Sequence, residues 1–313
     1  MAIKGMLKRL LLRGASLAAG QAEEAGRAGR NVEIVLAAAL HEPGTLARIH
    51  HPAAYVELLR SSIEPMACSV KDVLDEKTEN DSAARRFATL VDVLRSDVPP
   101  IPLATAQEIA LVADRYRALP KLIDFDRWAG DVGLLFAISS SFGKKGRILS
   151  AIVRFSRSQR CLELGTAYGM SALYILSALK ANDGGGHLTT LEGFEPQFSL
   201  ASATLNERYG TMVSCRFGMT EEALPDLARS LERIDFFFHD AGHSRERYVR
   251  DFNAVIGILS PGSVALIDDI RWDDPRFSAQ PSETYRGWRE IVAHPRVRRA
   301  VEIDDGLGLV LLR

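Results

Sequence analysis

Residues 236–244 read FFFHDAGHS, and this stretch decides the fold. Three consecutive phenylalanines are typical of a strand that is buried on both faces, because side chains on a strand alternate between the two faces of a sheet. The chain then turns polar at once, with His239, Asp240 and His243. In parallel sheets covered by helices, ligands bind beyond the carboxyl ends of the strands. We therefore expect Asp240 and His243 to lie in a ligand-binding crevice.

Short apolar runs alternate with helical patterns throughout the carboxyl-terminal half of the chain. Five such strand–helix units predict a parallel sheet with helices on both faces. Two final apolar runs are joined by Asp305 and Gly306, a hairpin turn signal. The predicted fold class is therefore α/β, a doubly wound and mostly parallel seven-stranded sheet whose last strands are antiparallel. The seven expected strands are residues 161–165, 187–192, 212–217, 234–240, 263–269, 297–304 and 307–313.

The residues before this pattern are expected to be helical. The run VPPIP at residues 98–102 breaks any helix. We predict a helical amino-terminal region at residues 1–145, which covers the site or forms a dimer interface, and a second domain at residues 146–313. The expected helices lie within residues 31–40, 52–62, 66–95 and 104–118, the third being interrupted by the polar stretch KTENDS.

The first 20 residues form a basic amphipathic pattern, in which Lys4, Lys8, Arg9 and Arg13 alternate with apolar residues. Such a helix can lie on an anionic membrane or act as a targeting segment. It can also dock on the same protein or on a second subunit, as the apolar stripes of surface helices commonly do. We favour docking, and with it a homo-oligomer, over membrane contact.

Composition limits the classes of function. The chain has 313 residues, a formal net charge of -1 and 47% hydrophobic residues, which is typical of a globular protein. A general nucleic-acid binder would normally be basic, so we expect no nucleic-acid partner. No apolar run reaches the roughly 18–20 residues of a membrane span. Cys68, Cys161 and Cys215 show no CxxC spacing, which suits a reducing, cytoplasmic setting and predicts neither a disulfide framework nor a zinc site.

The first expected strand ends in a glycine-containing turn. Gly165 permits a tight turn, and Gly169 allows the following helix to start close to the sheet. The spacing is GxxxG, which differs from the GxGxxG fingerprint of dinucleotide sites. The second strand ends in Glu192, 27 residues after Gly165, where an acid can accept hydrogen bonds from both ribose hydroxyls. Together these signals favour a cofactor that contains a nucleoside and lacks a pyrophosphate.

Three carboxylates lie at the ends of the fourth and fifth expected strands: Asp240, Asp268 and Asp269. Neighbouring carboxylates repel one another, and a hard divalent cation such as Mg²⁺ relieves that repulsion. Asp268 is the least secure of the three ligands, because neighbouring residues of a strand point to opposite faces. The alternative is that Asp269 caps a turn or a helix and that no metal binds.

The segment from about Arg160 to Arg313 resembles the class I S-adenosylmethionine-dependent methyltransferases. Within them it is most similar to metal-dependent small-molecule O-methyltransferases of the catechol, caffeoyl-CoA and macrolide-sugar types. The resemblance implies a Rossmann-like methyltransferase fold, S-adenosyl-L-methionine and Mg²⁺ or another divalent cation as cofactors, and methylation of a hydroxyl (EC 2.1.1.-) on a natural product, phenol, catechol or sugar. It rests on ELGTAYGMSA, LTTLEGFEP, FGMTEEALPDL, IDFFFHDAGH and LSPGSVALIDDIRW, in this order.

The resemblance also implies roles for individual residues. His243, three residues after the first metal-binding aspartate, takes the position of the general base, and imidazole suits proton transfer near neutral pH. The alternative is that His243 caps the following helix or bonds solvent, whereas His239 is expected to be a core residue or to lie behind the site. The implied metal ligands are Asp240, Asp268 and Asp269. The implied cofactor contacts are Glu163, Gly165 and Ser171 at the methionine, Glu192 at the ribose, Met219 and Thr220 near the adenine, and Asp240. The alternative for Met219 is a core methionine, since methionine fills irregular gaps.

The acceptor is open between a phenol or catechol, a sugar hydroxyl and a carboxylate. Residues 271–288 carry Trp272, Phe277, Tyr285 and Trp288, which either wall an acceptor pocket or pack in the core. A different class of function also stays open. In this alternative, the chain is a catalytically silent, methyltransferase-like module that binds a partner through its amino-terminal helices.

Overall fold

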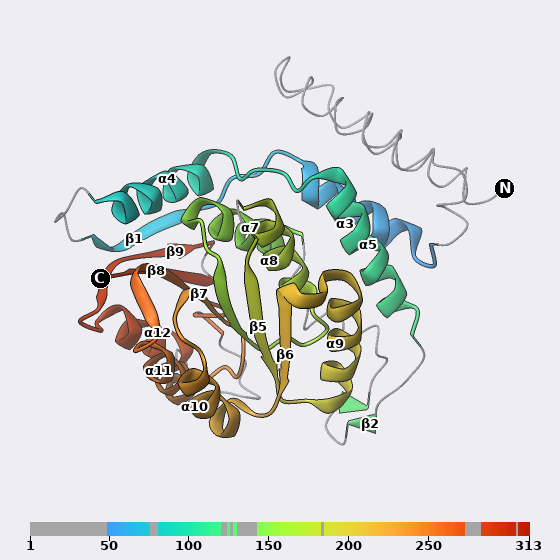
Figure 1. Ribbon diagram of the computed structural model, residues 1–313. Helices are drawn as coiled ribbons and strands as arrows, with labels where there is room; N and C mark the ends of the chain where they lie inside the picture. Colours follow the sequence, from blue (N-terminus) through green and yellow to red (C-terminus); the bar gives the residue numbers. More distant parts are fainter. Residues whose placement is uncertain are drawn as a thin grey trace, which may run out of the picture. The chain divides into compact units, whose positions relative to one another are not determined.

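The computed structural model describes residues 49–75, 81–119, 124–125, 128–129, 143–182, 185–272, 283–304 and 306–313 (Figure 1). Contacts between Cα atoms divide the chain into two compact units. One unit comprises Met1–Pro65 and Pro100–Leu119, and the other comprises Met66–Pro99 and Pro120–Arg313. The helical segments expected within residues 1–40 lie outside the described residues. The domain boundary expected at residue 145 stays a prediction, and the contacts group residues 66–99 with the carboxyl-terminal part.

In the first unit, helices α3 (Pro52–Ile63) and α5 (Leu103–Arg117) pack against each other. Both helices were predicted from the sequence. The carboxylate of Asp114 is buried, and it accepts hydrogen bonds from the backbone N–H groups of His50 and His51 at 2.8 and 2.6 Å. These two donors precede α3, so a side chain of one helix satisfies backbone groups at the start of the other.

The second unit is built on an eight-stranded sheet with the order β1-β9-β10-β8-β7-β4-β5-β6. The pairs from β8 through β7, β4 and β5 to β6 are parallel, whereas β8–β10, β10–β9 and β9–β1 are antiparallel. The predicted α/β class, the seven expected strands and the antiparallel end of the sheet are therefore confirmed. The strands are β1 (Val70–Asp75), β4 (Arg160–Leu164), β5 (His187–Glu192), β6 (Val213–Phe217), β7 (Ile234–His239), β8 (Leu259–Ile267), β9 (Val297–Ile303) and β10 (Leu307–Leu312). A separate two-stranded ladder joins β2 (Asp124–Phe125) to β3 (Trp128–Ala129).

Strand β1 corrects the helix that we expected across residues 66–95. Its apolar residues Val70, Val73 and Leu74 have the spacing of one helical face, yet the segment pairs with β9, with Val70 opposite Ile303. Over six residues this spacing fits a half-buried edge strand as well as a helix, and pairing with a distant strand decides between them. The helix starts later, as α4 (Ser82–Ser96), where the Asp81 carboxylate caps the N–H of Ala84 at 2.7 Å.

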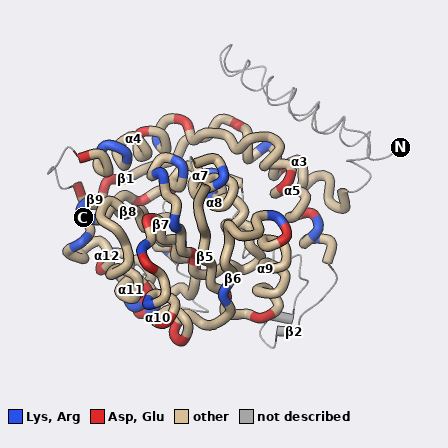
Figure 2. The backbone as a smooth tube through the Cα atoms, viewed as in Figure 1, with Lys and Arg blue, Asp and Glu red and all other residues tan. Residues whose placement is uncertain are grey.

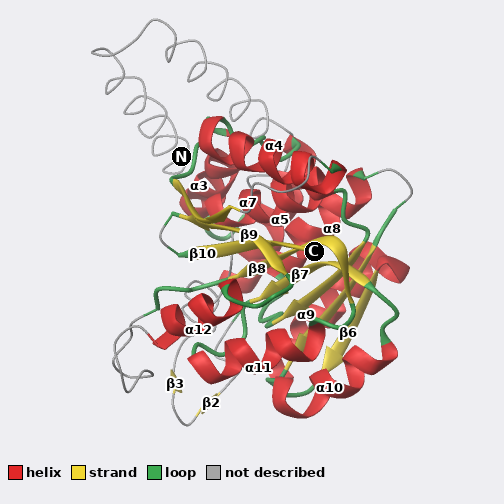
Figure 3. Cartoon of the chain, turned by 90° about the vertical axis from the view of Figure 1, so that its left-hand side faces the viewer, coloured by secondary structure: helices red, strands yellow, loops and turns green. Residues whose placement is uncertain are grey.

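Helices cover both faces of the sheet (Figure 3). Helices α4, α7 and α8 lie on one face, and α10, α11 and α12 lie on the other, as predicted for a doubly wound sheet. Helix α9 follows β5 and packs on α8 and β6. The helices are α7 (Lys144–Ser156), α8 (Met170–Ala181), α9 (Glu195–Tyr209), α10 (Thr220–Ser230), α11 (Arg245–Val255) and α12 (Glu283–Val292).

The three phenylalanines belong to β7, which lies between β4 and β8. The side chains of Phe236, Phe237 and Phe238 are all 0% exposed. Phe237 packs in a cluster with Tyr248 and Phe252 of α11. Burial of one large apolar side chain contributes about 1.5–3 kcal/mol. The run therefore anchors the central strand, and it sets where the polar residues that follow leave the sheet.

Basic and acidic residues are interspersed along the described backbone (Figure 2), consistent with the net charge of -1. Among the helices that the structure describes, none combines the length and the apolar composition that crossing a bilayer requires.

Candidate active site

The carboxyl ends of β4, β7 and β8 meet at one edge of the sheet. The N–H of Asp240 donates to Leu164 O and that of Asp268 donates to His239 O, both at 2.9 Å, so the ladder continues into the loops. Gly165 has a φ of +87°, and a Cβ at this position would overlap the carbonyl oxygen of Asp240. Glycine is required here both for its backbone conformation and for this close approach.

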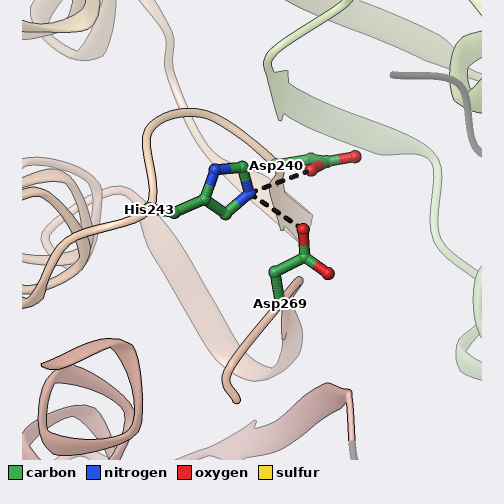
Figure 4. A group of neighbouring side chains, drawn as sticks. All are labelled: Asp240, His243 and Asp269. Carbon is green, nitrogen blue, oxygen red and sulfur yellow. Dashed lines mark ion pairs between the residues drawn. The ribbon is translucent and has the colours of Figure 1, made fainter. Parts of the chain in front are cut away.

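Three side chains converge at this edge (Figure 4). His243 Nε2 lies 3.0 Å from Asp269 Oδ2 and 3.9 Å from Asp240 Oδ1. One potential ligand atom from each residue lies within 4.8 Å of the others, which is a spacing that can hold a metal ion. Asp269 has a φ of 51°, a left-handed conformation that aspartate tolerates better than most residues.

Asp268 lies beside this group and has partners of its own. Its side chain is 1% exposed and forms an ion pair with Lys145 Nζ. Its Oδ1 accepts a hydrogen bond from the backbone N–H of Asp269 at 2.8 Å. Among the described residues, the group of side chains that could hold a metal ion consists of Asp240, His243 and Asp269, and it does not include Asp268. The role of Asp268 as a metal ligand stays a prediction.

The neighbouring charges perturb one another. Burial raises the pKa of Asp240 well above its ordinary value, the charge of Asp268 raises it further, and Lys145 opposes the shift. Burial also acts to raise the pKa of Asp269, but His243 and Lys145 outweigh it and hold that pKa below its ordinary value. For Lys145, burial lowers the pKa while Asp268, Asp240 and Asp269 raise it, and the net shift is upward. The site therefore concentrates negative charge around one ammonium group.

One of the two alternatives for His243, the role of a helix cap, is excluded by its surroundings. The residue that caps α11 is Ser244, whose hydroxyl accepts from the N–H of Arg247 at 3.3 Å. The imidazole stacks on the indole of Trp272, with ring centroids 4.9 Å apart. His243 is 28% exposed and directs Nε2 toward the two carboxylates. It is therefore placed to exchange a proton or to bind a cation at this edge.

His239 is a core residue, which was one of its two expected roles. Its side chain is 0% exposed, and Nε2 lies 3.0 Å from Asp251 Oδ2. Its ring meets that of Tyr248 edge-on, with centroids 5.0 Å apart. The Tyr248 hydroxyl in turn donates to the backbone oxygen of Asp268 at 2.6 Å. These contacts join α11 to the carboxyl ends of β7 and β8.

Glu192 lies at the end of β5 and meets the loop after β4. Its Oε2 accepts from the N–H of Ala167 at 2.7 Å, and its Oε1 accepts from the N–H of Phe194 at 2.8 Å. The thioether of Met219 lies so close to Gly193 that a Cβ there would overlap the sulfur. The structure therefore brings Gly165, Glu192 and Met219 to the same edge of the sheet. Thr220, the first residue of α10, accepts from Arg250 at 3.0 Å.

Glu163 and Ser171 are buried, at 0% and 4% exposure. The hydroxyl of Thr190 donates to Glu163 Oε2 at 2.6 Å. Burial raises the pKa of Glu163 to about 7, while hydrogen bonds from Ser171 and Thr190 act to lower it. Both residues lie within the protein interior, and their contact with a cofactor stays a prediction.

The pKa of Glu163 predicts how stability changes with pH. Between its ordinary pKa of 4.5 and about 7, the folded protein holds a proton that the unfolded chain has released. The contribution of this group to stability therefore falls as pH rises through that window, by about 1.4 kcal/mol per pH unit. We expect the stability of Glu163→Gln relative to wild type, measured by urea unfolding, to increase between pH 5 and pH 8. The exposed control Glu232→Gln should give the same difference from wild type at both values, and the same result for Glu163→Gln would contradict the raised pKa.

Two contacts of the site were not predicted from the sequence. The ion pair of Lys145 with Asp268 joins residues 123 positions apart, and no local motif marks Lys145. The stacking of Trp272 on His243 could be anticipated only as a general pocket role for aromatic residues after β8. Among those aromatic residues, Trp288 is 0% exposed and donates to Glu302 at 3.0 Å, so it packs in the core. Tyr285 lies under the guanidinium of Arg271 at 4.4 Å, and Phe277 is outside the described residues.

The sequence matches known methyltransferases. Residues 162–270 match the family described as a methyltransferase domain. The chain is 27% identical over 183 residues to the catechol O-methyltransferase of Niastella koreensis, covering 54% of this chain and 80% of the relative. It is 28% identical over 149 residues to the catechol O-methyltransferase of Mus musculus, covering 46% of this chain and 51% of the relative. The chain thus spans from about half to four fifths of the length of these relatives.

Solved structures share the fold. The O-methyltransferase from Bacillus cereus in complex with SAH superposes with a TM-score of 0.50 at 21% identity, covering 72% of this chain and 96% of that protein. The SAH-bound methyltransferase PaMTH1 of Podospora anserina gives 0.53 at 17% identity, covering 75% and 97%. Residues 162–270 therefore match a methyltransferase domain, the chain shares the Rossmann-like fold of these solved structures, and its sequence is similar to those of catechol O-methyltransferases.

Proposed function

We propose that the chain transfers the methyl group of S-adenosylmethionine to a hydroxyl of a small molecule, with the help of a divalent cation. The observation that carries this proposal is the convergence of Asp240, Asp269 and His243 beside the Gly165 turn. Methyl transfer to a hydroxyl requires an electrophilic methyl group, an oriented oxygen and a group that accepts the proton. The site offers residues suited to each of these needs.

The end of β5 suits the nucleoside of the cofactor. The two carboxylate oxygens of Glu192 accept the backbone N–H groups of Ala167 and Phe194, and a carboxylate offers about four lone-pair sites in all. Two ribose hydroxyls can therefore donate to Glu192 without loss of the bonds that shape the loop. When bound, the cofactor supplies a methyl group on a sulfonium sulfur, which leaves as a neutral thioether when the bond to the acceptor oxygen forms.

The donor set at the edge of the sheet suits a cation. Carboxylate oxygens of Asp240 and Asp269 would hold it, and oxygen ligands are the preference of Mg²⁺. Asp268 would join them as a third ligand if its ion pair with Lys145 opened. A bound divalent cation would act as a Lewis acid on the acceptor hydroxyl and lower the pKa of that hydroxyl.

His243 is the proposed general base. Its Nε2 faces the carboxylates at which the hydroxyl would be held, and it lies 3.0 Å from Asp269 Oδ2, so Asp269 could orient the imidazole. The stacked Trp272 limits the orientation of the imidazole. The acceptor oxygen loses its proton to His243 and takes the methyl group, so the proton and the charge are both accounted for.

The direct test is transfer of labelled methyl groups from S-adenosylmethionine to a panel of acceptors that includes a catechol, a phenol, a sugar and a carboxylate. We expect methyl transfer to a hydroxyl acceptor in the presence of Mg²⁺. The transfer should be lost in EDTA and should recover when Mg²⁺ is added again. Full activity after exhaustive chelation would rule out the cation. Calorimetry that detects cofactor binding without turnover of any acceptor would instead favour the silent binding module.

We expect Glu192→Ala to weaken cofactor binding by at least about a hundredfold. The substitution removes two hydrogen bonds to a charged acceptor, each of which contributes about 1.5–3 kcal/mol. Equilibrium dialysis with labelled cofactor measures the affinity. Glu195→Gln, an exposed acid three residues further on, is the matched control and should bind as wild type does. Unchanged affinity in Glu192→Ala would show that the ribose lies elsewhere.

A further inference from the structure

Lys145 enters the site from a segment that lies before the matched methyltransferase domain. It is the second residue of α7, and its Nζ pairs with Asp268 Oδ2. The lysine side chain is 34% exposed, whereas that of Asp268 is 1% exposed. A buried carboxylate that lost its cationic partner would keep a large desolvation penalty. Loss of this ion pair should therefore lower the free energy of unfolding more than loss of an ion pair between exposed side chains would.

The start of α7 is held firmly against its neighbours. The N–H of Gly143 donates to the Tyr174 hydroxyl of α8 at 3.3 Å. A Cβ at Gly146 would overlap the Tyr174 ring, so the two helices approach closely at this point. The buried guanidinium of Arg147 donates to the carbonyl oxygen of Val98. Lys145 lies between these contacts and is thus placed by the packing of α7 on α8, the helix that follows the Gly165 turn.

The ion pair also shapes the turn that carries Asp269. While Oδ2 of Asp268 pairs with Lys145, Oδ1 accepts from the backbone N–H of Asp269 at 2.8 Å. Asp269 has the left-handed φ of 51°, a conformation that needs local support. Both oxygens of Asp268 are thereby engaged within the protein. The carboxylate of Asp269 is left to face His243 at 3.0 Å.

We propose that the ammonium group of Lys145 is a built-in counter-ion of the acidic cluster, which consists of Asp240, Asp268 and Asp269. It neutralises Asp268 and competes with a divalent cation for this cluster. This inference rests on the proposed function, since it presumes that Asp240 and Asp269 bind a cation. In the resting protein the ammonium group offsets the repulsion among three carboxylates. A divalent cation that enters must bind against the ammonium charge or displace it from Asp268. Lys145 is therefore a positioning residue that sets the affinity for metal.

Lys144 provides a matched control. It adjoins Lys145 in α7, carries the same charge and also forms an ion pair, with Asp304 at 2.8 Å. Its side chain is 48% exposed, and Asp304 belongs to the turn after β9. Removal of either lysine changes the net charge of the protein by the same amount, but only Lys145 contacts the acidic cluster in the described part of the chain.

The experiment uses the full chain as wild type, Lys145→Gln, Lys145→Arg and Lys144→Gln. Isothermal titration calorimetry with Mg²⁺ or Mn²⁺ measures metal affinity, and thermal unfolding is followed in EDTA and in excess metal. We expect Lys145→Gln to bind metal about tenfold more tightly or better, because a like charge has left the site. In EDTA the melting temperature of Lys145→Gln should be lower than that of Lys144→Gln. In excess metal this difference should disappear. Lys145→Arg and Lys144→Gln should bind as wild type does.

Equal or weaker metal affinity in Lys145→Gln, with binding in wild type, would overturn the competition. If neither wild type nor any variant binds metal, the proposed cation requirement fails, and the unfolding data alone test the counter-ion. In that case a lower melting temperature of Lys145→Gln than of Lys144→Gln supports the neutralising role. Equal melting temperatures of these two variants in EDTA would overturn it.

Discussion

Replacement of Asp240 or Asp269 by asparagine is expected to abolish methyl transfer while cofactor binding persists. Asparagine keeps the shape of the side chain and removes the charge that would hold a cation. Stabilisation of the transition state by a bound cation amounts to several kcal/mol, so each variant should lose at least about a hundredfold in rate. Cofactor affinity should change little, because the proposed partner of the ribose is Glu192 and because asparagine at position 240 can still hydrogen-bond the cofactor. Transfer assays and equilibrium dialysis on the same preparations measure the two quantities.

Asp226→Asn is the control for this pair of variants. Asp226 lies on α10, and its side chain is 78% exposed, so the variant loses the same charge far from any buried contact. It should retain wild-type turnover and the wild-type response to EDTA and Mg²⁺. Turnover near the wild-type level in Asp269→Asn would contradict the proposed cation site. A loss of cofactor affinity as large as the loss of rate would instead assign these carboxylates to the cofactor.

His243→Ala is expected to lower the rate of methyl transfer by about 10²–10⁴, the usual share of a positioned general base. Cofactor affinity should be nearly unchanged. The deficit should shrink near pH 10, where a phenolic acceptor ionises without help. The deficit of Asp240→Asn should persist there, because orientation of the acceptor is still required. Pre-steady-state transfer rates at neutral and high pH, for wild type and both variants, provide the comparison.

The same variant separates two roles that the geometry allows for His243. Its Nε2 lies close enough to Asp240 and Asp269 to act as a third metal ligand. A base would leave the Mg²⁺ affinity of His243→Ala close to that of wild type, whereas a ligand would be needed for binding. The exposed His51 serves as a control in His51→Ala. A rate deficit in His243→Ala that stays constant up to about pH 10, with metal binding lost, would reassign His243 from base to ligand.

Much of the fold could be predicted because the relevant signals are local. Burial on both faces demands consecutive apolar residues, and β7 satisfies this with three phenylalanines of 0% exposure. Parallel strands that share a direction present their carboxyl ends at one edge, so Asp240 and Asp269 could be brought together by reasoning on strand ends alone. Strand β1 could not be identified in this way, because its six residues fit helical spacing and its partner β9 lies more than 200 positions away.

The sequence by itself determined the order of the strands along the chain, the antiparallel hairpin at its end and the acids that follow β7 and β8. The tertiary structure alone decided which side chains the neighbouring acids contact. Asp268 and Asp269 are adjacent, but one is buried against Lys145 and the other faces His243. Alternation of side chains predicts that the two diverge, yet which partners they meet depends on the packing of α7 and on the turn after β7. A lysine 123 positions away has no local signal, because its contact with Asp268 exists only after the helix has packed.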